Sequence, residues 1–62
     1  MQIIWCDGYA RDNISERVVA TGITNEIEAD IIVTALRRMV EGDESNWYKI
    51  EVDDYVPYKW VP

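Results

Sequence analysis

Residues 25–42 read NEIEADIIVTALRRMVEG, and this stretch decides the fold because it predicts a single long helix. Asn25 opens a capping-box pattern, and Thr24 is an equally good N-cap. Gly42 supplies a stop signal, and two consecutive arginines precede it where positive charge suits the helix dipole. We therefore expect the helix to begin near Asn25 and to end before Gly42.

Apolar residues cover most of the circumference of this predicted helix. At about 100° per residue, the polar side chains fall within roughly a third of the circle. A small sheet covers an apolar stripe little more than about 100° wide, so the edge of the apolar arc needs another cover. The residues at that edge are Ala29, Val33, Leu36 and Val40. A second subunit would make these four residues the self-association surface of a homodimer, and the alternative cover is the aromatic C-terminal segment of the same chain.

Four segments outside the helix have strand composition. Residues 2–6 (QIIWC) are apolar on both faces, which indicates a central strand or one covered on its second side. Residues 17–21 (RVVAT) predict a second strand, and residues 47–52 (WYKIEV) alternate as a half-buried strand does. Residues 55–62 (YVPYKWVP) are strand-like, but Pro57 cannot donate to a ladder and confines them to an edge or an extended arm.

Together these elements predict one α+β domain over residues 1–62. Its core is a small antiparallel sheet of three to four strands with one helix packed on it, in the order ββαβ or ββαββ.

The composition of the 62-residue chain argues against catalysis and cofactors. A chain of this size has a marginal core, and small domains often add disulfides, a metal or a partner subunit. One cysteine and no histidine leave no disulfide and remove the usual zinc or iron site. Without histidine, a general acid or base would need a carboxylate or lysine strongly shifted inside a pocket that so short a chain can hardly enclose. We expect no enzyme activity, no catalytic residue, no metal and no cofactor.

The charge points to a basic protein partner. Twelve acidic and six basic residues give a net charge of −6, and residues 41–62 carry six acids and two bases, or −4. A field of this sign repels nucleic acid and anionic membranes and steers towards basic surfaces. We therefore expect no direct nucleic-acid binding and no membrane contact. The alternative is that the acidic surface only keeps a small protein soluble.

Carboxylates in two predicted turns, with aromatic residues beside them, suggest a partner-binding site. A duplex presents about one negative charge per 1.7 Å of axis, so arrayed carboxylates can occupy a groove built for phosphates, as in a DNA mimic. Exposed aromatic side chains would add the anchors that charge alone lacks. The predicted acidic residues are Glu41, Asp43, Glu44, Asp53 and Asp54, and the predicted aromatic residues are Trp47, Tyr55, Tyr58 and Trp60. The alternative is that these aromatic residues serve as core and latch.

The stretch from Val18 to Leu36 runs from a strand through Gly-Ile-Thr into an acidic helix start and a helix rich in Ala and Ile. This stretch, about a third of the chain, resembles the short hairpin–helix–strand proteins of bacteriophage accessory genes, which include anti-CRISPR and other anti-defence inhibitors. The resemblance implies only a class of protein and assigns no functional role to any residue of this chain. It implies a phage protein that inhibits by stoichiometric binding, and we expect it to occlude a basic, nucleic-acid-binding surface of a bacterial defence protein.

Two other functions fit the same sequence. One is an oligomeric sponge that traps a signalling nucleotide between an aromatic ring and Arg11, Arg17, Arg37 or Arg38. The other is a small structural subunit. The apolar run Met1–Cys6 is too short for a signal peptide or a membrane span, so we expect a cytoplasmic protein, in the host bacterium if a phage encodes it.

Overall fold

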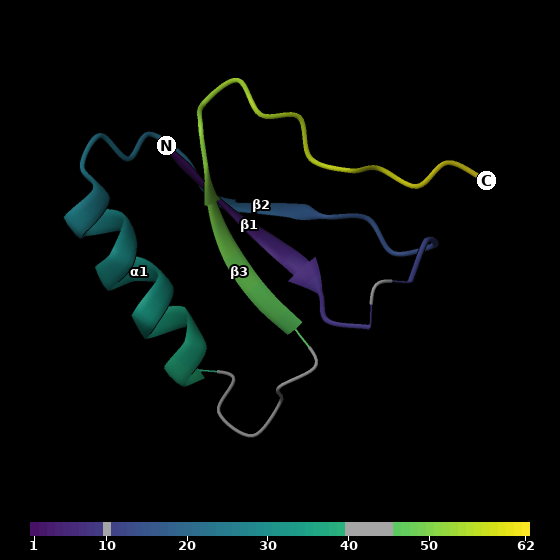
Figure 1. The fold of residues 1–62 in the computed structure, drawn as a ribbon, viewed down its shortest axis with the longest axis horizontal. Coiled ribbons are helices and arrows are strands. Elements are labelled where there is room, and N and C mark those ends of the chain that lie inside the picture. Colours follow the sequence, from purple (N-terminus) through teal and green to yellow (C-terminus); the bar gives the residue numbers. More distant parts are fainter. Residues whose placement is uncertain (10, 40–45) are drawn as a thin grey trace.

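One helix and three strands make up the fold in a computed structural model that describes residues 1–9, 11–39 and 46–62. In chain order they are β1 (Gln2–Asp7), β2 (Arg17–Ala20), α1 (Glu26–Met39) and β3 (Asn46–Glu51). The strands form one antiparallel sheet in the order β2-β1-β3, and α1 packs on one face of it (Figure 1). This confirms the α+β class. Of the two expected orders the structure has ββαβ, because residues 55–62 form an extended arm and no strand.

β1 is the central strand, as its two apolar faces predicted. It pairs with β3 along its whole length and with β2 over a shorter stretch, with a register irregularity between Ile3 and Ile4. Alternation along the strand directs Ile3 towards α1 and Ile4 towards the opposite face. Both side chains are fully buried, so both faces of the strand are covered.

The start of α1 follows from its capping residue. The Asn25 side-chain oxygen accepts a hydrogen bond from the backbone N–H of Ile27 at 2.7 Å, and the Asn25 carbonyl accepts one from Ala29 at 3.0 Å. Asn25 is therefore the N-cap, which decides between the two residues that the sequence offered. The predicted stop at Gly42 lies outside the described residues.

The core lies between α1 and the sheet. Its buried members are Ile3, Ile23, Ala29, Val33 and Tyr48, and partly buried residues such as Ile50 pack around them. Burying a side chain of this kind contributes about 1.5–3 kcal/mol, so few positions can be lost from so small a core.

The predicted self-association surface is wrong where the structure describes it. Ala29 and Val33 are 0% and 5% exposed in the core, and Leu36 is half-buried against them. The fourth residue, Val40, lies outside the described residues. The sheet packs against the stripe through Ala29 and Val33, and that leaves the opposite face of α1, which carries Ile27 and Ile31, in solvent.

The C-terminal arm, which we call the tail (residues 52–62), covers the other face of the sheet (Figure 1). The Gln2 amide donates to the carbonyl oxygen of Tyr55 at 2.7 Å, and the Lys49 ammonium donates to the Tyr55 hydroxyl at 2.6 Å. Lys49 is the β3 partner of Ile4, so these contacts lay the tail over Ile4. The tail is thus a latch, but on the sheet and not on the helix arc that the alternative expectation gave it.

Candidate functional site

A hollow lies on the tail side of the sheet, where the tail meets the loop that follows β1. We call it the tail cleft; it measures about 250 Å³. Its lining consists of Cys6, Asp7, Arg11, Asp12, Ile14, Glu16, Trp47 and Tyr58. Strand β1 with the loop that follows it, the start of β3 and the tail all contribute, so the fold brings together three parts of the chain that are far apart in the sequence.

Hydrogen bonds fix the tail along one side of the cleft. The Tyr58 hydroxyl donates to the Asp12 carbonyl at 2.5 Å, and the Tyr58 backbone N–H donates to the Glu16 carboxylate at 2.9 Å. In return the Glu16 backbone N–H donates to the Tyr58 carbonyl at 2.9 Å. Two residues further on, the Trp60 N–H donates to the Ser15 hydroxyl at 3.0 Å. These contacts hold the Tyr58 ring at the cleft.

Glu16 is the hub that joins the tail to the sheet. Its carboxylate accepts a hydrogen bond from the Tyr55 hydroxyl at 2.5 Å and lies 3.0 Å from the Lys49 ammonium. Desolvation by burial raises the pKa of Glu16, but the hydrogen bonds from Tyr55, Tyr58 and Lys49 outweigh it and lower the pKa to about 2. The hydrogen bond with Tyr55, followed by the pairing with Glu16, raises the pKa of Lys49. Both groups are therefore charged at neutral pH and neutralise each other.

Asp7 and Arg11 form a second ion pair at the cleft. The Arg11 guanidinium contacts both carboxylate oxygens of Asp7 at 3.0 Å, and this hydrogen bonding lowers the pKa of Asp7 to about 2. Arg11 also stacks 5.3 Å from the centroid of the Tyr9 ring. Its charge is thus already satisfied within the chain, which disfavours Arg11 as a nucleotide clamp.

Arg17, another candidate for that role, stacks 5.1 Å from the Trp5 ring centroid. Arg37 and Arg38 are exposed on α1, away from the tail cleft. The structure therefore does not gather the four arginines predicted for a nucleotide sponge into one site within a single chain.

Cys6 forms the floor of the cleft, with its side chain 3% exposed. Desolvation by burial, followed by the nearby negative charge of Glu16, raises the pKa of its thiol to about 11. A thiol is nucleophilic only as its thiolate, so this cysteine is chemically quiet at neutral pH. The arrangement offers no activated nucleophile at Cys6.

The cleft collects two of the four predicted aromatic residues. Trp47 and Tyr58 line it and remain 48% and 47% exposed. Trp60 is 41% exposed further along the tail, outside the lining. Tyr55 is half-buried in the contact with Glu16. Tyr55 therefore acts as a latch, Trp47 of β3 lines the cleft, and Tyr58 does both.

The predicted acidic residues lie elsewhere. Asp53 and Asp54 are exposed in the turn that follows β3, and neither lines the cleft. Asp53 lies 2.7 Å from the N-terminal amino group. Glu41, Asp43 and Glu44 are outside the described residues. The carboxylates that do line the cleft are Asp7, Asp12 and Glu16, and none of them belongs to the predicted acidic set.

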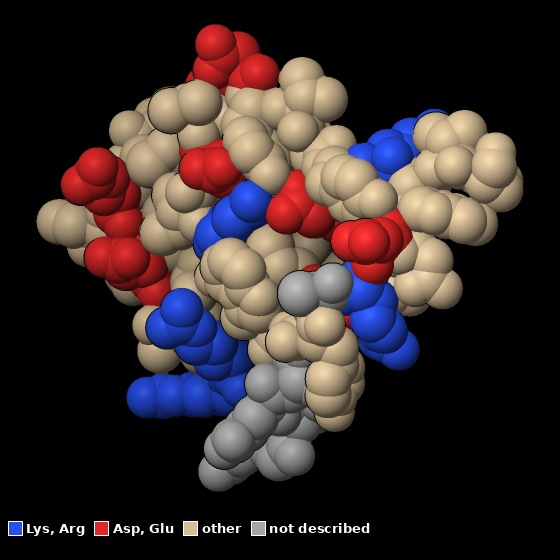
Figure 2. Space-filling view, turned by 45° about the vertical axis from the view of Figure 1, so that its right-hand side comes forward, with Lys and Arg blue, Asp and Glu red and all other residues tan. Residues whose placement is uncertain are grey.

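Charge on the face that Figure 2 shows is distributed in small groups. Acidic side chains there alternate with Lys and Arg side chains, and among the described residues of this face they form no continuous acidic stripe (Figure 2). The lining of the tail cleft carries three carboxylates and one guanidinium, and with the Lys49 ammonium that pairs with Glu16 the local charge is −1. No group of His, Cys, Asp or Glu in residues 1–9, 11–39 and 46–62 is arranged to hold a metal ion.

Sequence reasoning missed the cleft because its walls meet only in the folded chain. Asp12 and Tyr58 are 46 positions apart, and no spacing rule connects them. The usable signal was weaker: two tyrosines and a tryptophan in a proline-containing segment that cannot be a central strand.

Comparisons with known proteins do not assign a function to this chain, so the function is argued from the geometry of the site. No known protein family, curated protein or solved structure matches the chain. Within the part of the chain that the structure describes, no helix combines the length and the apolar character needed to cross a membrane.

Proposed function

We propose that the protein is a non-enzymatic binding protein that takes a basic side chain of a protein partner into the tail cleft. One observation carries the proposal: two half-exposed aromatic rings, Trp47 and Tyr58, lie with carboxylates in one preformed hollow, whose charge is −1 when the Lys49 partner of Glu16 is counted. An arginine or lysine side chain fits this chemistry, because aromatic faces and carboxylates both attract cations.

The ion pairs within the cleft leave one carboxylate for a ligand. Asp7 is held by Arg11, and Glu16 is held by Lys49. Asp12 is exposed and has no cation within 4.0 Å among the described residues. Its backbone carbonyl accepts the hydrogen bond of the Tyr58 hydroxyl, so the backbone of Asp12 is held beside the Tyr58 ring. We therefore assign Asp12, Trp47 and Tyr58 as the ligand-contacting residues.

The size of the cleft favours a side chain over a nucleotide. Sites for small-molecule ligands usually measure about 300–1,000 Å³, and the tail cleft at about 250 Å³ lies just below that range. Tryptophan and tyrosine are also enriched among the residues that dominate protein interfaces. Both features support a protein partner rather than the sponge.

Inhibition would follow from the same contact. A partner that uses arginines or lysines to bind phosphates would lose them to the cleft, and this is how the protein would act as an anti-defence inhibitor. That role rests on the resemblance and on the net charge of −6, and it stays a prediction. It requires that nucleic acid and this protein compete for the partner.

A short arginine peptide is a suitable probe for the cleft. We expect it to shift the NMR signals of the Trp47 indole and the Asp12 amide, and a glutamine peptide of equal length to shift neither. Asp12→Asn should weaken binding by about threefold to tenfold, whereas Asp54→Asn, which makes the same change in net charge at the turn after β3, should not.

Tryptophan substitutions provide a second matched pair. Trp47→Ala should abolish most of the binding, and Trp60→Ala should leave it within about twofold, since only Trp47 lines the cleft. Circular dichroism checks that each variant is folded. Equal losses from the two members of either pair would show that the peptide binds by general charge attraction, and the cleft would then not be the site.

A further inference from the structure

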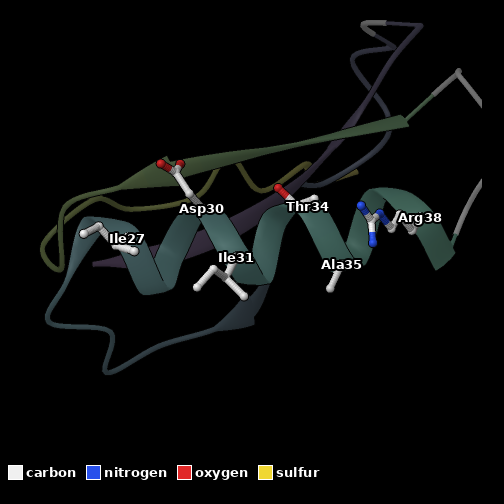
Figure 3. A pocket seen from close by; sticks show the side chains of 6 residues that line it. All are labelled: Ile27, Asp30, Ile31, Thr34, Ala35 and Arg38. Atoms are coloured by element: carbon white, nitrogen blue, oxygen red, sulfur yellow. The ribbon is translucent and has the colours of Figure 1, made fainter.

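The outward face of α1 points away from the sheet and carries large apolar side chains. A shallow hollow of about 510 Å³ on this face is lined by Ile27, Asp30, Ile31, Thr34, Ala35 and Arg38 (Figure 3). All six residues belong to one helix, so the hollow is an open surface that needs a second body to close it. We call these six residues the α1 outer face.

Exposure of the isoleucines marks the α1 outer face as unusual. Ile27 is 70% exposed and Ile31 is 64% exposed, and Met39 at the end of the helix is 82% exposed. Single exposed apolar residues are common, but a contiguous apolar row flanked by charges is typical of an interaction surface.

Charge changes sign along the α1 outer face. Asp30 lies in its N-terminal half and Arg38 at its C-terminal end, and Figure 3 shows Ile31 and Ala35 between them. Neither charge has an opposite charge within 4.0 Å among the described residues. The same polarity holds for the whole helix, with Glu26 and Glu28 in the first turn and Arg37 beside Arg38 in the last.

We infer that the α1 outer face is the contact between two copies of this chain, with their helices antiparallel about a two-fold axis near the middle of α1. In this arrangement Asp30 of each copy faces the paired arginines of the other. Ile31 of each copy packs near Thr34 and Ala35 of the other, and Ile27 packs on the aliphatic stem of Arg38. A two-fold axis repeats each contact, so the surface is self-complementary.

The charges on the α1 outer face favour antiparallel over parallel pairing of the two helices. A parallel arrangement would place Asp30 against Asp30 and Arg38 against Arg38, and like charges across an interface are unfavourable. The antiparallel arrangement also places the positive end of each helix dipole beside the negative end of the other. A partner of uniform charge would be repelled at one end of the face, which is why a second copy suits it better than a purely basic or acidic partner.

The size of the α1 outer face sets the expected affinity. With 14 residues α1 is about 21 Å long and about 10 Å wide, which gives a contact on the order of 200 Å² in plan per copy. Stable interfaces bury about 800 Å² per partner, so this is a weak contact. We expect association in the range of tens to hundreds of micromolar. The face lies on the opposite side of the sheet from the tail, so a dimer would leave both tail clefts open.

Charge exchange tests this pairing by sedimentation equilibrium. Asp30→Arg alone and Arg38→Asp alone should each weaken association by about tenfold or more, because two symmetric contacts change from attraction to repulsion. The double variant, which keeps the net charge of −6, should associate more tightly than either single variant, because position 30 then again meets an opposite charge at position 38. An equimolar mixture of the two single variants should also associate, since each then meets its opposite charge.

Controls separate the pairing from changes in net charge or in folding. Asp54→Arg makes the same change in charge as Asp30→Arg away from α1 and should leave association unchanged. Ile31→Ser should weaken association but keep the thermal midpoint at high dilution, because Ile31 is exposed in the single chain.

A wild-type chain that stays monomeric up to millimolar concentration would overturn the inference, and the α1 outer face would then belong to a different partner. Association that survives both single charge reversals would overturn the antiparallel pairing. Neither result bears on the arginine-peptide experiment, which probes the other side of the sheet.

Discussion

Replacing Glu16 by Gln tests how the tail is held to the sheet. The substitution keeps the shape of the side chain but removes the charge that pairs with Lys49 at 3.0 Å and accepts from the Tyr55 hydroxyl at 2.5 Å. Glutamine can still accept one hydrogen bond, so the substitution removes only the electrostatic contribution of the carboxylate to the contact. We expect a folded protein with lower stability and a looser tail.

The magnitude follows from the pKa of Glu16. Folding lowers this pKa from an ordinary value near 4.5 to about 2, and each unit corresponds to about 1.4 kcal/mol. That difference of about 2.5 units gives an upper limit of about 3.5 kcal/mol. Because the side chains of Glu16 and Lys49 are 17% and 25% exposed, water screens part of the interaction, and we expect about 1–2 kcal/mol. For a domain of this size the thermal midpoint would fall by roughly 5–15 °C.

The pH dependence has a definite sign. A carboxylate whose folded pKa lies below its unfolded pKa stabilises the protein above about pH 4.5, and this stabilisation is lost as the pH falls towards about 2. The stability difference between wild type and Glu16→Gln should therefore be full at neutral pH and should shrink to near zero at about pH 2. Thermal melts followed by circular dichroism across this range measure it.

Glu51→Gln is the matched control for this experiment. Glu51 also lies near Lys49, but at 3.8 Å, and no hydrogen bond from its side chain to the tail is found in the described residues. We expect its loss to cost well under about 1 kcal/mol. Trypsin should cut after Lys59 faster in Glu16→Gln than in Glu51→Gln. Equal effects of the two substitutions on stability and on cleavage would refute the role of Glu16 as the hub of the tail.

Three further predictions concern the core, the tail and the thiol. Val33→Glu should unfold the chain, because it buries an unpaired charge at a position 5% exposed, whereas Ile31→Glu should stay folded by circular dichroism. Removing residues 55–62 should expose Ile4 and lower the free energy of unfolding in urea by several kcal/mol, and an unchanged value would show that the tail is no part of the fold. The Cys6 thiol should react with a disulfide reagent at least about tenfold more slowly in the native protein than in urea, since it is buried with a raised pKa, and equal rates would contradict that environment.

The helix shows where sequence reasoning succeeded and where it failed. Its cap at Asn25 and its position between β2 and β3 were predictable, because capping and turn signals are local. Its buried face was not predictable. Apolar residues surround most of the helix, so periodicity alone does not tell whether the sheet meets the stripe of Ala29 and Val33 or that of Ile27 and Ile31. The smaller side chains of the first stripe face the sheet.

The candidate site shows the same contrast between features that local sequence predicts and features that depend on tertiary packing. The sequence placed Trp47 and Tyr58 among the candidate aromatic residues, and both line the cleft and are about half exposed. It did not predict that Asp12 meets them, since that contact depends on how the loop after β1 folds against the tail. The pair Asp53 and Asp54, which the clustering of acidic residues in the sequence favours, lies outside the cleft.

The central position of β1 also has a kinetic consequence. Its pairing with β3 joins Gln2 to Glu51, so the sheet closes only when two distant parts of the chain meet. Helix α1 can form locally in about a microsecond, but its apolar stripe has no sheet to pack against until β1 and β3 have paired. We expect folding on the millisecond-to-second scale seen for chains dominated by non-local pairing, which stopped-flow fluorescence can measure. Since the tail docks on a sheet that must already exist, changes in the tail should mainly speed unfolding, and changes at the β1–β3 pairing should slow folding.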